Sequence, residues 1–321
     1  MPIINAPTNT TPREDLQGSF VKGNLPFMTS ATQILRPLPI SRAKGAMDVI
    51  NRTSTLQRVS NGIARSRSGG FKTANIERTE VTFRTQTYGI KVPYDAKDRA
   101  DYQDLYDYEK TLSDIGQAIV YREQEARLNT FFNASDFASG TRGSTPSNPW
   151  SDPVNGTPRA DVASARETRY KATGLTNGWY LACTFMTLLH LKKSNDMWAN
   201  RKYGQYPQTE QEKIRAITEE FEVAGLILVG GRYNAAGENL AESMDDLWTP
   251  TKAALVRVAE TDDPSEPCVG RTFYNDQFGG LMTVSTYFDN DILSDQYLSY
   301  QDVTEKALDL ECGHVFYSIA S

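Results

Sequence analysis

The sequence predicts an α+β fold, and three patterns along its 321 residues support that class. Residues 50–93 are rich in β-formers and are typical of a long hairpin, while residues 102–132 have the spacing of one long helix. From Gly178 onward, short apolar runs alternate with helical patterns, which indicates a compact α/β part. The hydrophobic fraction of 39% lies well above disordered composition, so the chain can bury a core.

Residues 1–40 are predicted to form an extended N-terminal arm. This segment is rich in Pro, Thr and Asn, and proline disfavours a regular helix. Such arms are usually disordered unless something tethers them. Five apolar residues indicate that this arm is partly tethered: Phe20, Leu25, Phe27, Ile34 and Leu35.

Residues 41–93 are predicted to form an extended loop built on a long β-hairpin. The stretch "TEVTFRTQTYGIKVP" places Val81 and Phe83 on one face, and Gly89 is suited to a bulge or bend. The segment "TSTLQRVSNGIAR" is the expected partner strand, with the tip near Gly69-Gly70. Both faces are largely polar, and an isolated two-stranded hairpin is marginally stable in water. We therefore expect something outside this chain to hold the hairpin down.

Residues 94–175 are predicted to form a peripheral domain around a helix at about 102–132. Thirty residues would span about 45 Å as a helix. A second helix is expected in "TPRADVASARETRYKATG", with Thr157 as N-cap, Pro158 in first position and Gly174 at its end. Alternating three- and four-residue spacings predict one buried stripe on the long helix: Leu105, Tyr108, Leu112, Ile115 and Ile119.

Residues 176–284 are predicted to form a compact axial domain, and residues 285–321 to return to the peripheral domain. "GWYLACTFMTLLHLKKSND" indicates a strand that leads into a helix. Further strands are expected in "EVAGLILVGG", "KAALVRVAE", "FGGLMTVSTYFDNDI" and "CGHVFYSIA".

The charge is unevenly distributed along the chain. Residues 42–84 hold nine Lys or Arg and only three acids, so this segment carries +6, and a total of −6 leaves −12 for the remainder. A charge run of this kind is most often a solvated face. Two further interpretations are a nucleic-acid surface, for which the segment offers few aromatic residues, and a contact with the acidic part of a second copy. The third interpretation also explains the polar faces of the hairpin.

Motifs for catalysis or metal binding are missing from the sequence. His190 and His314 have no Cys or second His at ligand spacing, and the acids Asp289, Asp291 and Asp295 do not fit an EF-hand loop. There is no P-loop, zinc-protease or nucleophile-elbow motif. We therefore predict no catalytic residues, no metal, no cofactor and no enzymatic activity.

Targeting signals are also missing. The first residues, "MPIINAPTNTTPRED", do not have the pattern of a signal peptide, and the longest apolar run, "VAGLILVGG", is too short to cross a bilayer. Three scattered cysteines do not indicate a disulfide framework. We expect a protein of the reducing cytosol with no membrane contact.

The order of these parts resembles the major capsid protein of tailed bacteriophages, with its HK97-type fold. "YGIKVPYDAKDRAD" leading into "EKTLSDIGQAIVYREQEARLNTFF" resembles the family's hairpin return and spine helix. "NGWYLACTFMTLLHLKKSND" is similar to the entry of its axial domain, and "YNDQFGGLMTVSTYFDNDILSD" to the return toward the periphery. The resemblance covers nearly the whole chain, but it consists of an order of elements rather than a signature.

The resemblance implies a function in shell assembly. In the family the hairpin, or E-loop, overlaps an adjacent subunit, and copies form the hexamers and pentamers of an icosahedral shell around genomic dsDNA. The basic residues carried over to the loop are Arg65, Arg67, Lys72 and Arg78, with Phe71 as an apolar anchor. The acidic residues carried over to the start of the spine helix are Asp104, Asp107 and Glu109.

The resemblance also implies partners and a location. Separate scaffolding and portal proteins are expected partners, with a decoration protein as a further candidate, in a virion assembled in the bacterial cytoplasm. No cross-link is predicted for Lys72, because no asparagine partner can be identified. Two alternatives stay open: an encapsulin-like compartment and, from another class, a cytosolic α/β enzyme or nucleic-acid-binding protein.

Overall fold

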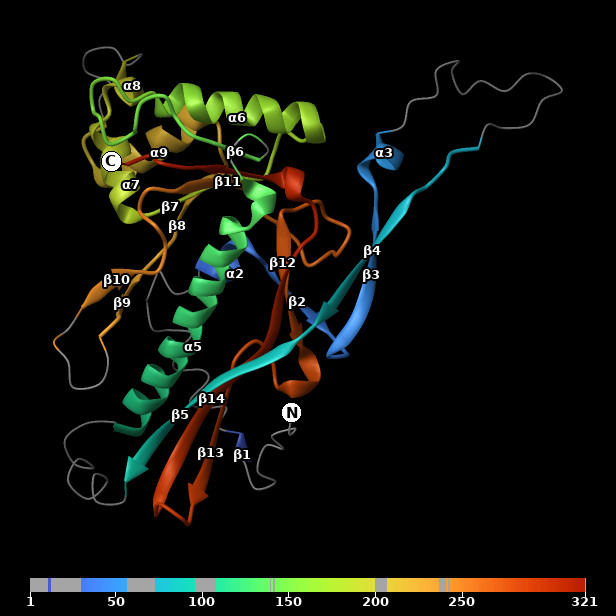
Figure 1. Cartoon of the computed structure of the whole chain (residues 1–321), viewed down its shortest axis with the longest axis vertical. Helices are drawn as coiled ribbons and strands as arrows, with labels where there is room; N and C mark the ends of the chain where they lie inside the picture. The colour runs from blue at the N-terminus through green and yellow to red at the C-terminus, as the bar shows by residue number, and fades with distance from the viewer. Residues whose placement is uncertain are drawn as a thin grey trace.

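Two sheets organise the described part of the chain. The computed structural model describes residues 11–12, 30–56, 73–95, 108–138, 140, 142–199, 207–236, 241 and 243–320. Within them, a five-stranded sheet lies under a layer of helices, and an elongated six-stranded sheet is crossed by one long helix (Figure 1). Two-stranded ribbons extend from this body.

The five-stranded sheet forms the buried centre of one half of the molecule. The runs of β7 and β11 are almost fully buried, as expected for strands covered on both faces. β11 pairs antiparallel with β7 and β15, whereas β8 runs parallel to β7 and β6 parallel to β15. In spatial order the strands are β6 (Gly143–Ser144), β15 (Gly313–Phe316), β11 (Ala253–Arg257), β7 (Trp179–Cys183) and β8 (Gly225–Leu228). The strands expected in "GWYLAC", "GLIL", "AALVR" and "GHVF" are thus confirmed.

Helices cover one face of this sheet and share its core (Figure 1). The predicted first helix is confirmed: Pro158 is its first residue, and Gly174 ends it with φ 71°, although Thr157 makes no side-chain capping bond. The last helix begins with a capping box between Thr209 and Glu212. The helices are α6 (Pro158–Thr173), α7 (Phe185–Lys193), α8 (Asn195–Trp198) and α9 (Glu210–Phe221).

The elongated sheet is built around one long strand, β14 (Ser294–Ala307). The first part of β14 lies between two antiparallel partners, and its last part pairs with a third. A parallel strand from the N-terminal segment extends the sheet beyond that third partner. The other strands are β13 (Thr283–Asp289), β5 (Gln86–Asp95), β12 (Gly270–Asn275), β2 (Pro37–Ile40) and β1 (Thr11–Pro12).

The sheets divide the chain differently from the predicted segments. β12 lies before residue 285 but belongs to the elongated sheet, and β15 lies after it but returns to the five-stranded sheet. α6, expected in the peripheral segment 94–175, covers the five-stranded sheet instead. Strand pairing between distant segments leaves no pattern in a single sequence, so boundaries drawn along the chain missed these exchanges.

The long helix α5 (Tyr108–Asn133) confirms the predicted element, while its expected first residues, 102–107, lie outside the described residues. The predicted stripe is wrong at Ile115, which is 47% exposed, whereas Leu112 is buried as expected, and Leu105 lies outside the described residues. A Cβ at Gly116 would lie 2.8 Å from Ser299 Oγ, so glycine lets this face of the helix approach β14 closely. The buried face recurs every four residues instead, at Leu112, Gly116, Val120, Gln124, Leu128 and Phe132.

The predicted hairpin is paired differently from the expectation. β4 (Arg78–Arg84) pairs antiparallel with β3 (Lys44–Ile50), not with the stretch from Thr53, and the short helix α3 (Arg52–Thr55) follows β3. Residues 86–95 form β5 inside the elongated sheet, in unbroken register past Gly89, so the expected bulge there is wrong. The strand is interrupted at Thr85, whose N–H donates to the Ala43 carbonyl.

Smaller elements complete the described chain. The N-terminal segment forms a short helix before β2, although a helix-free arm was expected there. Its residues Ile34 and Leu35 are fully buried, which confirms the tether at this part of the arm, while Phe20, Leu25 and Phe27 lie outside the described residues. The remaining elements are α2 (Ser30–Ile34), β9 (Arg232–Asn234), β10 (Met244–Asp246) and the 3-10 turns η1 (Ser135–Phe137), η2 (Asp276–Phe278) and η3 (Leu310–Cys312).

Candidate subunit interface

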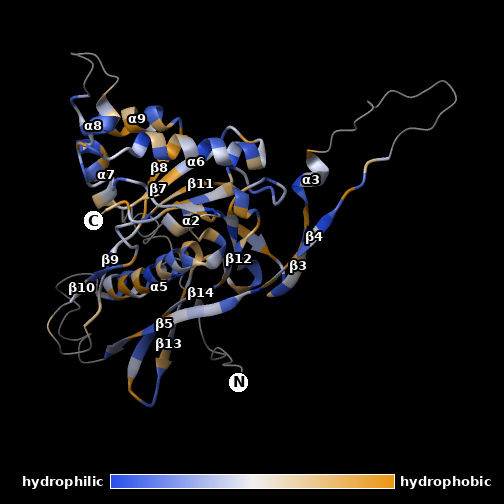
Figure 2. Cartoon of the chain, turned by 45° about the horizontal axis from the view of Figure 1, so that its top comes forward, coloured by the Kyte–Doolittle hydropathy of each residue, from blue (hydrophilic) through white to orange (hydrophobic). Residues whose placement is uncertain are grey.

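β3, α3 and β4 form a ribbon that stands away from the body (Figure 1). Side chains along both of its strands are exposed or half-buried. Three large aliphatic side chains near its outer end are about half exposed: Ile50 (49%), Ile76 (57%) and Leu56 (59%). Figure 2 shows hydrophobic colour gathered on β7, β8 and β11, whereas β4 is largely hydrophilic. The ribbon therefore lacks the apolar cover that stabilises the rest of the fold.

An aromatic stack and a set of hydrogen bonds form a joint between the base of the ribbon and the body. The ring of Phe83 stacks on Phe273 with centroids 5.1 Å apart and planes 14° from parallel. Buried Asp302 accepts hydrogen bonds from Thr85 Oγ1 at 2.9 Å and from Asn275 Nδ2 at 3.1 Å. Thr87 Oγ1 adds a bond to the same carboxylate at 3.3 Å. The aromatic stack and the three hydrogen bonds to Asp302 thus fix the place where β4 passes into β5.

Two of the predicted interface residues lie within the described chain. Arg78 begins β4 and approaches Asp48 of β3 at 3.6 Å, and both side chains are 61% exposed, so this pair within the ribbon is weak. Glu109 lies in the first turn of α5 and is partly exposed. The others lie outside the described residues: Arg65, Arg67, Phe71, Lys72, Asp104 and Asp107.

Sequence reasoning missed a buried carboxylate on the long helix. Glu125 is 2% exposed and accepts hydrogen bonds from Ser30 Oγ at 2.5 Å and from the Ala31 N–H at 2.8 Å. Burial raises the pKa of Glu125 to about 7, against the opposing effect of these hydrogen bonds. The carboxyl group joins α2 to the middle of α5. No sequence pattern distinguishes Glu125 from the other charged residues of this helix, so its burial could not be predicted.

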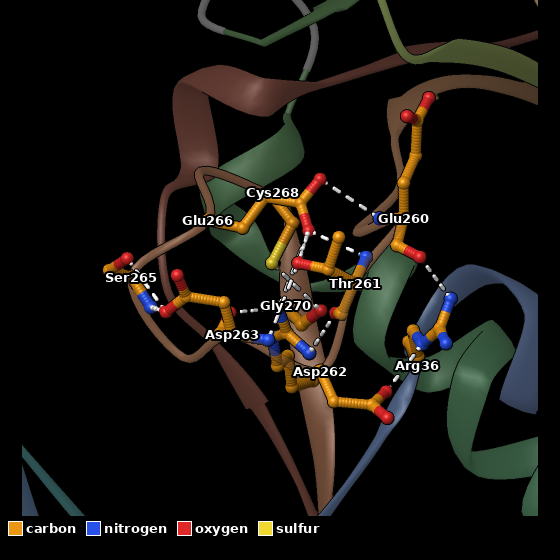
Figure 3. Close-up of polar contacts among 10 residues, drawn as sticks. Arg36, Glu260, Thr261, Asp262, Asp263, Ser265, Glu266, Cys268 and Gly270 are labelled. Carbon is orange, nitrogen blue, oxygen red and sulfur yellow. Dashed lines mark hydrogen bonds and ion pairs between the residues drawn. The ribbon is translucent and has the colours of Figure 1, made fainter.

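A second attachment holds the N-terminal segment to an acidic loop, residues 260–266 (Figure 3). Arg36 donates from Nε to Asp262 at 2.8 Å and from a terminal nitrogen to the Glu260 carbonyl at 2.5 Å. The carboxylate of Glu266 braces the loop by accepting from the backbone N–H groups of Glu260 and Thr261. Arg271, fully buried, donates to two carbonyls of the same loop. Residues 30–40 therefore act as a strap across the body.

The hairpin between β13 and β14 carries a further exposed apolar group. Phe288, Ile292 and Leu293 are each more than half exposed, and Leu293 adopts a left-handed conformation with φ 48°. A leucine rarely takes this conformation, which is strained for a branched side chain. The stretch "FDNDIL" could have indicated this exposed group from sequence, because it places apolar residues beside the polar residues of a turn.

The described residues contain no group of three or more metal-ligating side chains. His190 lies on α7, and His314 lies in β15 with its Nε2 2.9 Å from Ser144 Oγ. Burial, with a smaller effect of Arg169, lowers the pKa of His314 to about 4. Both histidines occupy the predicted elements. Among the helices in the described ranges, none has the length and hydropathy needed to cross a membrane.

Comparison with solved structures identifies the fold. A phage-related protein from Bordetella bronchiseptica superimposes with a TM-score of 0.68 over 97% of this chain and 98% of its own, at 16% identity. The capsid protein of cyanophage P-SCSP1u matches with a TM-score of 0.59 over 100% and 91% of the two chains, at 11% identity. This chain has the HK97-type capsid fold.

The same capsid fold extends to a shell that is not a phage head. The SrpI encapsulin of Synechococcus elongatus matches with a TM-score of 0.50 over 99% of this chain and 91% of its own, at 11% identity. No protein-family model and no curated protein matches the sequence. At these identities the likeness shows the fold alone, so the ribbon and its contacts carry the functional argument.

Proposed function

We propose that this chain is the coat subunit of a tailed-bacteriophage head. In this proposal, copies assemble into the hexamers and pentamers of a closed icosahedral shell that encloses dsDNA. The ribbon is the observation that carries the proposal: it is joined firmly at its base, and the side chains of both its strands are exposed or half-buried. The HK97-type fold and the phage-capsid neighbour support it.

The proposed contact places the ribbon of one subunit on the next. Its basic outer part, with Arg65, Arg67, Lys72 and Phe71, lies on the acidic start of the neighbouring long helix at Asp104, Asp107 and Glu109. A single exposed ion pair contributes about 0–1 kcal/mol, so no pair holds the shell by itself. Many copies of the contact, each engaging together with the others, give a stable particle.

The proposal also covers partners and location. A subunit with a net charge of −6 has little attraction for the DNA that it encloses, so the genome stays free to leave. Separate scaffolding and portal proteins would start and direct assembly in the bacterial cytoplasm. The mature protein would then be part of the virion, as a structural component with no catalytic activity.

Purified full-length protein tests the proposal directly. Static light scattering after size exclusion, followed by negative-stain electron microscopy, should show capsomers or closed particles of megadalton mass. If scaffolding is needed, co-expression with the neighbouring structural genes supplies it. A stable monomer or small oligomer under all these conditions would contradict the proposal.

An encapsulin-like compartment is the second candidate, and the SrpI match favours it specifically. The two shells differ in their content. Particles recovered from the native host should contain nuclease-protected DNA if the chain is a phage coat protein, whereas a compartment should contain a cargo enzyme. Absorbance spectra and mass spectrometry of the purified particles separate the two.

A further inference from the structure

The ribbon contacts the body at a second place, far from its base. Hydrogen bonds link α3 to the opposite side of the ribbon. The N–H of Asn51 donates to the Glu77 carbonyl at 2.9 Å, and the N–H of Glu77 donates to Ser54 Oγ at 2.8 Å. Thr79 Oγ1 also donates to Asn51 Oδ1 at 2.7 Å. These bonds tie α3 to the segment entering β4, so a contact made by α3 acts on the whole ribbon.

Arg52 of α3 makes that contact. One terminal nitrogen donates to the Ala172 carbonyl in the last turn of α6 at 3.1 Å, and the other forms an ion pair with Asp309. The two charged side chains are only 23% and 26% exposed, so water screens this pair less than a surface pair. Leu56 lies beside the end of α6, where a Cβ on Gly174 would be 4.0 Å from its Cδ2.

Asp309 is held in place to receive the arginine. Its carboxylate accepts from the Glu311 N–H at 3.1 Å, which caps the η3 turn. Glu311 itself binds Arg142 at 2.7 Å and buried Arg169 at 2.5 Å. The second carboxylate oxygen of Asp309 accepts from Cys312 Sγ at 3.5 Å and is the oxygen that pairs with Arg52. The side that receives Arg52 is thus fixed by contacts within the body.

We infer that Arg52 is a positioning residue that fixes the angle of the ribbon in the free subunit. Two attachments, the joint at Thr85 and the Arg52–Asp309 pair, define a direction that a single joint leaves open. A ribbon held in one orientation loses less conformational freedom when a second copy binds it. This inference rests on the proposed function, because it assigns the Arg52 pair a role in the encounter between subunits.

Distance measurements on the unassembled full-length chain test the inference. The native Cys183, Cys268 and Cys312 are buried, so spin labels can be directed to an exposed site on β3 (Ala46→Cys) and one on α6 (Ser164→Cys). Pulsed electron paramagnetic resonance should give one narrow distance distribution. Arg52→Gln and Asp309→Asn should each lose it and give a broad one.

Three variants distinguish positioning from a general loss of structure. Arg78→Gln removes an arginine of the same ribbon whose ion pair with Asp48 stays inside it, and it should leave the distribution narrow. Arg52→Lys keeps the charge and should give a width between the two extremes. The exchange of charges in Arg52→Asp/Asp309→Arg should restore the narrow distribution, which a misfolded ribbon would not do.

Assembly provides the second readout. Under conditions where the wild type forms particles, Arg52→Gln should slow their formation about tenfold, within the range by which association rates vary among variants of one interface. Unchanged distance distributions in both Arg52→Gln and Asp309→Asn would overturn the inference. If the wild type never assembles but these variants still broaden the distribution, Arg52 positions the ribbon and it is the proposed function that fails.

Discussion

The five-stranded sheet and the ribbon are built by opposite means. In the core around this sheet, large side chains from strands, helices and a connecting loop are fully buried against one another, among them Trp150, Leu181 and Phe316. The ribbon has paired backbones but half-exposed side chains, and it is fixed to the body at a few polar and aromatic contacts. The first region is stabilised by burial within one chain. The second has a defined shape with exposed apolar side chains, as the proposed contact with a second copy requires.

Substitutions in the core of the five-stranded sheet should have the largest effect on the free energy of unfolding. Phe316 is fully buried and packs against Trp150 with ring centroids 5.1 Å apart. Phe316→Ala should lower the free energy of unfolding of the unassembled subunit by about 3–5 kcal/mol. The ribbon substitution Ile50→Ala should change it by less than about 0.5 kcal/mol, because the side chain is already half exposed.

Urea unfolding of both variants, followed by circular dichroism, measures this difference. For Ile50→Ala, the unassembled subunit should keep its stability, but the yield of assembled particles should decline. If Ile50→Ala destabilised the free subunit as much as Phe316→Ala, the ribbon would belong to the core and the contrast would be broken.

The strap across the body should respond to pH through Glu125. A folded-state pKa of about 7, above the ordinary 4.5, means that the folded chain keeps a proton that the unfolded chain loses. The contribution of Glu125 to the free energy of unfolding is complete below pH 4.5. It is lost as the pH rises to about 7, by roughly 3 kcal/mol at most. Glu125→Gln should remove this fall.

Thermal unfolding between pH 4.5 and 8 tests the effect as a difference between wild type and variant. His314, with its lowered pKa, contributes the opposite slope below pH 6.5, and subtraction removes it. Glu123→Gln, an exposed residue on the same helix, serves as the matched control. Parallel pH curves for wild type and Glu125→Gln would show that the carboxyl group does not titrate in this way.

The elements with a complete local pattern were predictable from sequence. α6 has its proline start and glycine end, and β7 and β11 are uninterrupted apolar runs. The buried face of α5 was not predictable, because Gly116 and Gln124 interrupt its apolar residues, and Gly116 is what lets the helix approach β14 closely. A stripe drawn through the largest apolar residues selected Ile115, which faces solvent.

The candidate site was predictable in outline only. An excess of basic residues and the lack of apolar faces identified an exposed arm, but the partner of β4 was assigned to the wrong segment. Both candidate strands carry weak alternation, so the pattern could not choose between them. The Arg52–Asp309 and Thr85–Asp302 contacts each join residues more than 200 positions apart, and no local signal encodes such a pairing.

The joint at the ribbon base should give an intermediate effect. Phe83→Ala removes the stacked contact with Phe273 and should lower the stability of the free subunit by about 1 kcal/mol. Backbone amides of β3 and β4 should exchange hydrogen faster, because the ribbon loses its aromatic support. Mass spectrometry after deuterium labelling measures this, with Phe288→Ala, an exposed phenylalanine on β13, as control. Equal exchange in both variants would mean that the stack does not support the ribbon.

The smallest effect on folding, with a large effect on assembly, is expected at the outer part of the loop. Arg65→Glu/Arg67→Glu should leave the free energy of unfolding within about 0.5 kcal/mol, as expected from the sequence for a solvated charge run. Particle formation should nevertheless fail, because like charges would then meet at the neighbouring acidic helix start. Lysines in place of Asp104, Asp107 and Glu109 should restore part of the yield. Arg215→Glu, which reverses an exposed charge on α9, should assemble normally, so that failure of the first variant is specific to the loop. Normal assembly of Arg65→Glu/Arg67→Glu would remove the charge contact from the proposed interface and leave only the apolar surface of the ribbon to hold the neighbouring subunit.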